Sequence, residues 1–561
     1  MIKNQSMYSH KVLKQQIKNN KKVLFLAVLF LFCLLINACS GEKEVTQTTS
    51  RDENAPSYGD TIVEASIADA RNLLPLLASD SASSGVCGLV FNGLVKYDKD
   101  LNLIGDLAQK WEVQNQGLTI IFYLRQGVKW HDGVKLTARD VEFTYQSLIN
   151  PQVRTPYSGD FKKVKSLEII DDYTIKITYE EPFSPGLSSW GMGVIPEHLL
   201  KDEDLNNTSF SRNPVGTGPY KFVKWKTQEQ IVLDVNPDYF EGRPFIERCI
   251  FRIIPDSTTM FLELQNLSID YMGLSPLQFM RQTDSAFFKT NYQKFNTQGF
   301  NFTYLGYNLE NEKFKDVRIR QALNYAVDKQ EIINGVLLGQ GRECTGPFAP
   351  KSWAYNQAVK ALRYNPEKAL ELLKECGWKM NPDHLLEKEG KLFEFTIITN
   401  QGNEQRQQTA EIIQKRLANI GIKVKIKIVE WNAFINEFIN KRKFETILLG
   451  WGLSLDPDLY DIWHSSKTKE GEFNFISYEN KQVDALIEQG RREFNQEKRK
   501  QLSYALHEII YREQPYMFLY TPDSLPIVSS RFKGIKVAPA GITYNFIKWF
   551  VPKHRQKYIL Q

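Results

Sequence analysis

Cysteine and histidine are scarce in this chain of 561 residues, which has six cysteines and seven histidines. No CxxC motif occurs among Cys33, Cys39, Cys87, Cys249, Cys344 and Cys376. A structural zinc site or a dithiol redox site is therefore not expected, because both need closely spaced cysteines. Whether the last four cysteines form one or two disulfides or stay as buried free thiols is left open by the sequence.

The common catalytic motifs are also absent from the sequence. No HExxH or GxSxG motif occurs, and in "GLVFNGLV" Leu94 stands where a P-loop needs its lysine after Gly88 and Gly93. His131 precedes a helix that we expect Thr137 to cap, so a place in a turn is favoured over catalysis. These absences argue against an enzyme.

Two carboxylates, Asp456 and Asp458, flank Pro457 in the stretch "GWGLSLDPDLY". An acid/base pair in an envelope hydrolase is one interpretation of this spacing. An Asp-Pro-Asp run after a strand is more typical of a loop and of helix capping. The sequence therefore favours lining or loop-shaping carboxylates over a hydrolytic pair.

The first 38 residues lack acidic residues and arginine but contain six lysines. An apolar run at residues 23–36 follows the lysines, and it is shorter than the roughly 20 residues that cross a bilayer, which predicts a secretion signal. The run ends in "INAC", which resembles a bacterial lipobox whose Cys39 becomes lipidated. A signal anchor with an incidental cysteine is the alternative, and the start is Met1 or Met7.

Residues 39–58 are polar and nearly free of large apolar side chains, which predicts a flexible tether ahead of a folded part that begins near Asp60. Without the six signal lysines the formal net charge of +6 falls to zero, so a nucleic-acid partner is not expected. The rest of the chain is long enough for two or three domains of ordinary globular composition.

Alternating helix and strand patterns mark the last third of the chain. In "NPEKALELLKECGW", Asn365 as N-cap, Pro366 in the first turn and Gly377 as terminator predict a helix. In "TAEIIQKRLANIGIKVKIKIVEW", helical spacing up to Gly421 is followed by strict alternation of apolar residues with lysine, which predicts a helix and then a strand. With a short buried strand at Thr446–Leu449, these patterns predict an α/β domain.

The first half of the chain is richer in strand patterns. Apolar runs broken by turn residues occur in "LTIIFYLRQGVKW" and "SLEIIDDYTIKITYEEPF", and "KFVKWKTQEQIVLDVNPDYF" has the pattern of a hairpin. No internal repeat of about 20 to 50 residues is evident, so a repeat architecture is not expected.

Six segments, in order along the chain, resemble bacterial extracellular solute-binding proteins of family 5, the oligopeptide- and dipeptide-binding lipoproteins of ABC importers. The resemblance covers the chain from about Asp60 to Phe550. The segments are "LAQKWEVQNQGLTIIFYLRQGVKWHDGVKLTARDVEFTYQSLINP", "NPVGTGPYKFVKW", "VRIRQALNYAVDKQEIINGV", "YNPEKALELLKECGW", "AEIIQKRLANIGIKVKI" and "GWGLSLDPDLYDIWHSS".

The resemblance implies an α/β, two-lobe periplasmic-binding-protein-like fold of type II, with an extra subdomain inserted in the first lobe. The first lobe would comprise residues 59–97, 214–300 and 515–550, with the subdomain at 98–213. The second lobe would be residues 301–514, and "NTQGFNFTYLGYN" would cross between the lobes. The two lobes would close on a ligand.

The resemblance also implies how a ligand is held. Family members bind extended peptides through backbone hydrogen bonds to strand-like segments, while the peptide side chains enter roomy hydrated pockets. Residues 83–87 and 450–454 match two such segments, and Trp451 would be a wall of the pocket. The implied ligand-binding residues are Ser83, Ser84, Gly85, Tyr304, Arg406, Gly450, Trp451, Gly452 and Asp456.

The two charged candidates at the ligand's ends each have an alternative. Peptide-binding members place an aspartate a few residues after the tryptophan to pair with the ligand ammonium, but here the next acid after Trp451 is Asp456. We favour helix capping for Asp456, which puts a free ligand N-terminus in doubt. Arg406 matches a position near which relatives hold a ligand carboxylate, and a solvated arginine ahead of a helix is the simpler interpretation.

The implied function is that of a lipid-anchored, extracytoplasmic binding protein that captures peptides and delivers them to ABC transporter permease subunits. It would act as a monomer without catalysis, metal or cofactor. A glycan, an opine or a nickel chelate on the same fold is the alternative, although the few histidines argue against nickel. An envelope hydrolase is the remote alternative.

Overall fold

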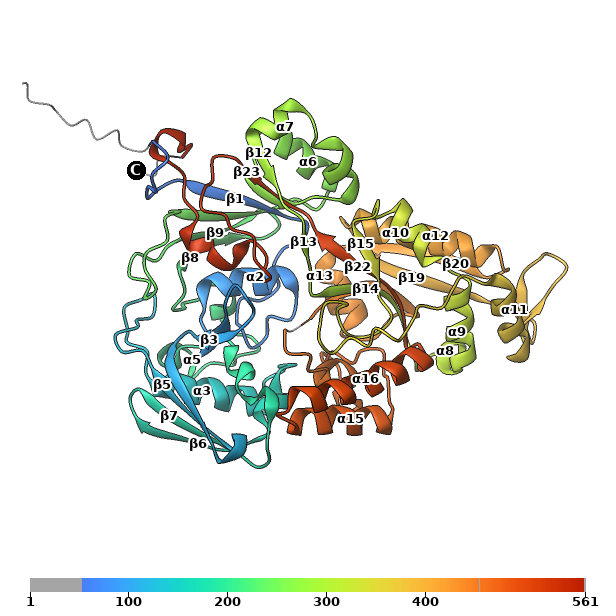
Figure 1. The fold of residues 1–561 in the computed structure, drawn as a ribbon, viewed down its shortest axis with the longest axis horizontal. Coiled ribbons are helices and arrows are strands. Elements are labelled where there is room, and N and C mark those ends of the chain that lie inside the picture. The colour runs from blue at the N-terminus through green and yellow to red at the C-terminus, as the bar shows by residue number, and fades with distance from the viewer. Residues whose placement is uncertain (1–52, 454, 559–561) are drawn as a thin grey trace, which may run out of the picture. The chain divides into compact units, whose positions relative to one another are not determined.

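The computed structural model describes residues 53–453 and 455–558 (Figure 1). The predicted signal segment 1–38, Cys39, most of the predicted tether and Ser454 lie outside the described residues. From Pro56 onward the described residues belong to one compact unit. None of the helices within the described ranges has the length and apolar character that a bilayer crossing requires.

A seven-stranded mixed sheet forms the first half of this unit. Strand β1 is central and runs parallel to β10 and β11, whereas the other pairs are antiparallel. The predicted hairpin is confirmed as β8 and β9. In spatial order the strands are β12 (Tyr292–Lys294), β23 (Pro526–Ser529), β11 (Tyr271–Gly273), β1 (Thr61–Ser66), β10 (Arg248–Ile253), β9 (Gln230–Val235) and β8 (Tyr220–Lys226).

A four-stranded antiparallel sheet lies within residues 98–213. Its spatial order is β4 (Ala108–Gln114), β5 (Thr119–Leu124), β7 (Thr174–Tyr179) and β6 (Val164–Asp171). Helix α3 (Ala138–Ile149) begins at Thr137, as predicted, and Asp140 completes a capping box. Two short helices, α4 (Ser158–Phe161) and α5 (Glu197–Leu200), also lie in this region, and its strand β3 (Leu103–Gly105) pairs with β2 (Val95–Tyr97), which precedes it.

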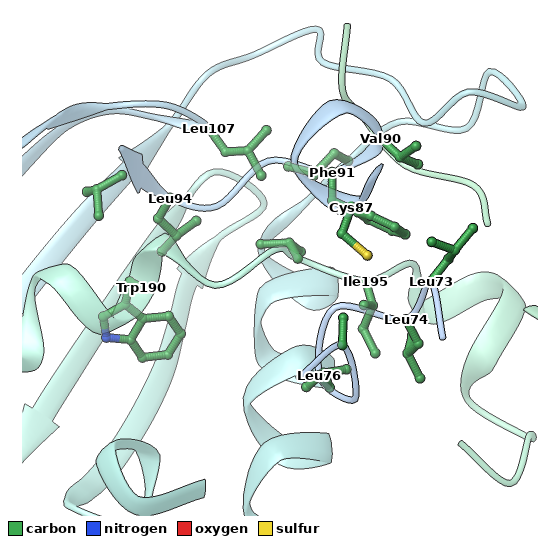
Figure 2. Packing of buried hydrophobic residues seen from close by; sticks show 14 of the residues in the cluster. Leu73, Leu74, Leu76, Cys87, Val90, Phe91, Leu94, Leu107, Trp190 and Ile195 are labelled. Atoms are coloured by element: carbon green, nitrogen blue, oxygen red, sulfur yellow. The ribbon is translucent and has the colours of Figure 1, made fainter. Parts of the chain in front are cut away.

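One continuous apolar core joins residues 98–213 to the first sheet. Residues 98–213, which we call the inserted region, lie in the chain between β1 and β8 of the first sheet. Buried side chains of the sheet, such as Ile62 and Leu233, belong to the same cluster as Phe122 and Trp190 of the inserted region. Figure 2 shows how Leu94, Leu107, Trp190 and Ile195 take part in this packing. The inserted region and the first sheet therefore share one closely packed core.

A second seven-stranded sheet forms the other half of the unit. Side chains alternate along β14, with Leu305 and Tyr307 in the core on one face and Phe302 and Tyr304 in the core on the other. The main spatial order is β13 (Thr297–Gln298), β22 (Tyr516–Ser524), β14 (Asn301–Tyr307), β21 (Thr446–Gly452), β19 (Glu394–Asn400) and β20 (Lys423–Val429), with β15 (Gly341–Glu343) paired to β22.

The predicted helices of the last third are present. Asn365 caps α11 (Pro366–Glu375), and α12 (Glu404–Ala418) precedes β20 as predicted. The other helices of the described second half are α8 (Glu312–Lys315), α9 (Val317–Tyr325), α10 (Lys329–Gly335), α13 (Trp431–Ala433), α14 (Tyr460–Trp463), α15 (Lys481–Arg492) and α16 (Gln496–Glu513), and α6 (Ser257–Gln265) and α7 (Ala286–Asn291) flank the first sheet.

Two stretches of chain cross between the large sheets, and they lie side by side. The chain leaves β12, enters β13 and β14 in the second sheet, and returns from β22 to β23 in the first. Thr297 pairs with Ser524 where the two crossings meet. Strand β22 thus lies in the second sheet, although the sequence assigned residues from 515 onward to the first lobe.

The four cysteines within the described residues are free and buried. Cys87 lies on α2 (Ser81–Val90) in the core of Figure 2, near Val90 and Phe91. Burial raises the pKa of the Cys87 thiol to about 12. Of the two alternatives that the sequence left open, the structure has the buried thiols.

Candidate ligand-binding cavity

A cavity of about 760 Å³ lies between the two halves of the unit. Its walls come from the start of α2, Tyr157 of the inserted region, the start of β14, the first turn of α12, the end of β21 and residues 456–462 and 471–475. The volume lies within the range of about 300–1,000 Å³ that small-molecule sites occupy. The cavity is thus large enough for a solute of several residues.

The first predicted ligand segment, residues 83–87, is helical and not strand-like. Asp80 caps α2, because its Oδ1 accepts from the backbone N–H of Ser83 at 3.0 Å and its Oδ2 accepts from Ser83 Oγ at 2.7 Å. The backbone groups of this segment are therefore used within the helix, and the expectation that they bind a ligand as a strand is wrong. Ser84 lines the cavity, whereas Ser83 is buried behind it and Gly85 is exposed away from it.

The second predicted segment is the end of strand β21. Gly450, Trp451 and Gly452 all line the cavity. Trp451 stacks on Phe475 with ring centroids 5.5 Å apart, and its Nε1–H donates to Tyr516 Oη at 3.2 Å. The indole is thus fixed from behind and presents a rigid apolar wall.

One edge of β21 is unpaired where it faces the cavity. On one side β14 pairs with the strand along its whole length, up to Asn301 opposite Gly452. On the other side β19 pairs with Thr446 and Ile447 alone among the described residues. The backbone of Gly450–Gly452 therefore has an edge that an extended chain could join by hydrogen bonds.

Arg406 is the one cationic side chain that lines the cavity among the described residues. It lies within the first turn of α12, where Asn403 caps the helix, and not ahead of the helix as the simpler interpretation had it. Its Nη1 donates to the amide oxygen of Asn400 at 2.7 Å, and the described residues place no carboxylate against it. Burial lowers the pKa of this guanidinium, so a ligand anion would relieve an uncompensated charge.

Tyr304 does not line the cavity in the described structure. Its side chain is fully buried and stacks on Tyr516, with ring centroids 3.9 Å apart. Tyr516 in turn accepts the hydrogen bond from Trp451. Tyr304 therefore packs behind the cavity wall and is linked to Trp451 through Tyr516.

Asp456 lines the cavity but does not cap the helix that follows, so the expectation of a cap is wrong. Its carboxylate pairs with Arg499 of α16, with Arg499 Nη1 3.3 Å from Asp456 Oδ2. The backbone N–H of Tyr460, the first residue of α14, instead donates to Asp458 Oδ1 at 3.1 Å. The pairing follows from long-range packing of α16 against the loop, which no local pattern encodes.

Two further carboxylates, Asp458 and Asp461, line the cavity beside Asp456. Burial and the neighbouring Asp461 charge raise the pKa of Asp458 to about 7. Asp461 pairs with Lys467 at 3.1 Å, and Asp458 Oδ2 lies 3.2 Å from Arg491 Nε. Asp456, Asp458 and Asp461 are thus each paired with a cationic side chain other than Arg406.

The family model of bacterial extracellular solute-binding proteins, family 5 Middle, matches residues 102–473. The chain belongs to this family. The oligopeptide-binding protein AppA of Bacillus subtilis is 33% identical over 543 residues, which are 95% of this chain and 99% of AppA. The match confirms the predicted resemblance and the two-lobe α/β fold.

Solved family 5 structures superpose over most of the chain. AppA from Bacillus subtilis in complex with a nonapeptide has a TM-score of 0.85 and covers 89% of this chain and 100% of its own. NikZ from Campylobacter jejuni in complex with Ni(L-His) is 32% identical, with a TM-score of 0.80 and coverage of 88% and 99%. DppA from Helicobacter pylori, an ABC transporter-associated protein in complex with peptide STSA, is 28% identical, with a TM-score of 0.81 and coverage of 90% and 100%.

Several cavity residues of this family 5 protein were missed by sequence reasoning. Tyr157, Trp431, Phe473 and Tyr520 line the cavity, but they come from four separate segments. Only the Asp80 cap had a local signal, a capping aspartate three residues ahead of Ser83. The aromatic residues are brought together by tertiary packing alone.

Proposed function

We propose that this chain captures peptides outside the cytoplasm and delivers them to the permease subunits of an ABC importer. The likeness to AppA and DppA, whose solved structures hold peptides, supports a peptide ligand. The likeness to NikZ, which holds Ni(L-His), keeps a nickel chelate as the competing solute. Binding without bond cleavage is the proposed activity, so the protein would return its ligand unchanged.

The observation that carries the peptide proposal is the unpaired edge at Gly450–Gly452 beside the uncompensated Arg406. An extended peptide would add to this edge by main-chain hydrogen bonds, and its C-terminal carboxylate would pair with Arg406. Trp451 and Ser84 would contact the ligand from opposite walls. Asp456 already has Arg499 as its counter-ion, so we assign it to the loop and not to a ligand ammonium.

The proposal also includes an anchor and a division into lobes. Lipidation at Cys39 would hold the protein on the membrane, and loss of membrane association in a Cys39→Ala variant tests this. The inserted subdomain would be residues 98–213, and we place the last crossing near residue 525, where β22 passes to β23. We propose that the protein acts as a monomer.

Native mass spectrometry of protein purified from its own host tests the ligand class. The expected result is a set of co-purifying masses that fragment as peptides and are released unchanged on denaturation. A co-purifying mass with the isotope pattern of nickel and with histidine would show that the ligand is a nickel chelate and not a peptide. Cleaved products with no intact peptide would contradict a binding protein and favour the hydrolase.

A further inference from the structure

Arg491, in the last turn of α15, is a buried cation between two carboxylates from different parts of the chain. Its side chain is 5% exposed and pairs with Asp160, 331 positions earlier, and with Asp458, at 3.2 Å. Its guanidinium also lies over the ring of Tyr460, at 4.1 Å from the centroid. We call Asp160, Arg491 and Asp458 the Arg491 bridge.

The two ends of the Arg491 bridge belong to different halves of the unit. Asp160 lies on α4 of the inserted region, where it accepts a hydrogen bond from Ser189 and where the neighbouring Phe161 packs edge-on against Trp190 at 5.2 Å. That region shares its core with the first sheet. Arg491 and Asp458, in contrast, lie in the chain between β21 and β22 of the second sheet. Figure 1 shows α15 beside the inserted region, where Ser184 Oγ donates to the carbonyl of Gly490 at 3.2 Å.

The Arg491 bridge also reaches the cavity. Asp458 and Tyr157, which lies three residues ahead of Asp160, both line the cavity. The Tyr157 ring meets Phe473 edge-on, with centroids 5.7 Å apart. A solute in the cavity would thus fix both the loop that holds Asp458 and the segment that holds Asp160.

A second ion pair also joins α15 to the inserted region, and neither of its residues lines the cavity. Arg492, the next residue of α15, pairs with Glu181 of the inserted region, with Nη2 3.3 Å from Oε1. Both side chains are much more exposed than Arg491, at 45% and 31%. Exposed pairs contribute little, whereas breaking a buried pair leaves an uncompensated charge. The two pairs therefore make a matched comparison.

We infer that Arg491 is a positioning residue that couples solute in the cavity to closure of the inserted region over the second lobe. When the lobes separate, Asp160 moves away and Arg491 keeps only the half-buried Asp458 as a counter-ion. A solute against Asp458 and Tyr157 favours the arrangement in which both carboxylates meet Arg491. This deepens the proposed function and rests on it for the solute, but the contact between the two segments does not depend on the solute's identity.

The test compares Asp160→Asn with Glu181→Gln, each of which removes one carboxylate from an arginine of α15. Amide hydrogen exchange of residues 156–163 and 488–494 is measured in the ligand-free full chain. Stopped-flow release of a nonapeptide with free termini is measured separately. We expect Asp160→Asn to speed exchange in both segments and peptide release by about tenfold, with association unchanged, and Glu181→Gln to change each less than about twofold.

Further variants separate coupling from a local structural effect. Asp160→Glu should restore slow release, and Asp458→Asn combined with Asp160→Asn should be less than additive, because both act through Arg491. Equal behaviour of Asp160→Asn and Glu181→Gln in exchange and release would overturn the inference. If Asp160→Asn exchanged faster but the parent protein bound no peptide, the result would support the role of the Arg491 bridge and contradict the proposed peptide ligand.

Discussion

The Nη2 atom of Arg406 lies 3.0 Å from the place that a Cβ atom on Gly450 would occupy. The same Cβ would lie 3.0 Å from the carbonyl oxygen of Phe302 on the neighbouring strand. The absence of a side chain at Gly450 thus lets the guanidinium lie close to the backbone of β21. The half-buried Arg406 and Gly450 are neighbours in the cavity wall.

Gly450→Ala should therefore displace Arg406 and weaken binding of a nonapeptide with a free carboxylate by about 1 to 3 kcal/mol, the usual cost of overpacking. Gly335→Ala on α10 is the control, because Gly335 does not line the cavity and a Cβ there meets nothing within 4 Å. Isothermal calorimetry on both variants measures the difference. Equal affinities for the two variants would contradict the arrangement.

Trp451→Ala should weaken peptide binding by about 2 to 4 kcal/mol, because it removes a rigid aromatic wall in the range of interface hot spots. Trp451→Phe keeps a ring against Phe475 and loses only the hydrogen bond to Tyr516. We expect that variant to retain most of the affinity. If the two variants lost affinity alike, the hydrogen bond rather than the wall would be the important feature.

Asp456→Asn should lower affinity equally for a free and an N-acetylated nonapeptide. The reason is that Asp456 already neutralises Arg499, so the variant disturbs the loop and not a ligand ammonium. The melting temperature should also fall, since the half-buried Arg499 loses its counter-ion. A loss confined to the peptide with a free N-terminus would show instead that Asp456 binds the ammonium.

The protein should lose stability in acid because His131 is neutral in the folded state. Its Nδ1 accepts from the backbone N–H of Gly216 at 3.2 Å and its Nε2–H donates to the carbonyl of Gly218 at 3.0 Å, an arrangement that needs the neutral ring. Burial lowers the pKa of His131 to about 4. Because the unfolded chain binds the proton more readily, with a pKa of about 6.5, this stability is present above that pH and is lost as pH falls towards 4.

Urea unfolding from pH 7 to pH 4 measures this effect. His131→Gln keeps one donor and one acceptor but does not titrate, so its unfolding free energy should depend less on pH, by up to about 3 kcal/mol over this interval. Burial also lowers the pKa of His507 to about 4. Because His507 is unchanged in the variant, the unfolding free energy of the variant should still depend on pH to some extent. Identical pH profiles for parent and variant would contradict the assignment.

Local signals in the sequence were enough for the elements that carry them. Asn365 and Pro366 start α11, and the switch from helical spacing to alternation at Gly421 separates α12 from β20, because capping and periodicity act within a few residues. The resemblance supplied Trp451 and Arg406 as cavity residues. It misled at residues 83–87, where the Asp80 cap gives a helix.

Long-range ion pairs were beyond sequence reasoning. Asp456 is 43 positions from Arg499, and Asp160 is 331 positions from Arg491. No spacing or motif in the sequence predicts either pairing, because each contact depends on how α15 and α16 pack. Solvated or capping roles were the natural expectation for such side chains, and only the fold shows which are paired and which, like Arg406, are not.

The most direct measurement of the central claim compares a nonapeptide as the free acid and as the C-terminal amide by calorimetry. The parent protein should bind the acid about tenfold or more tightly, as expected for a charge-assisted hydrogen bond to a half-buried arginine. Arg406→Met should abolish this preference, whereas Arg416→Met, on the same helix but paired with Glu331 outside the cavity, should keep it. Equal affinity of the parent protein for acid and amide would contradict the account.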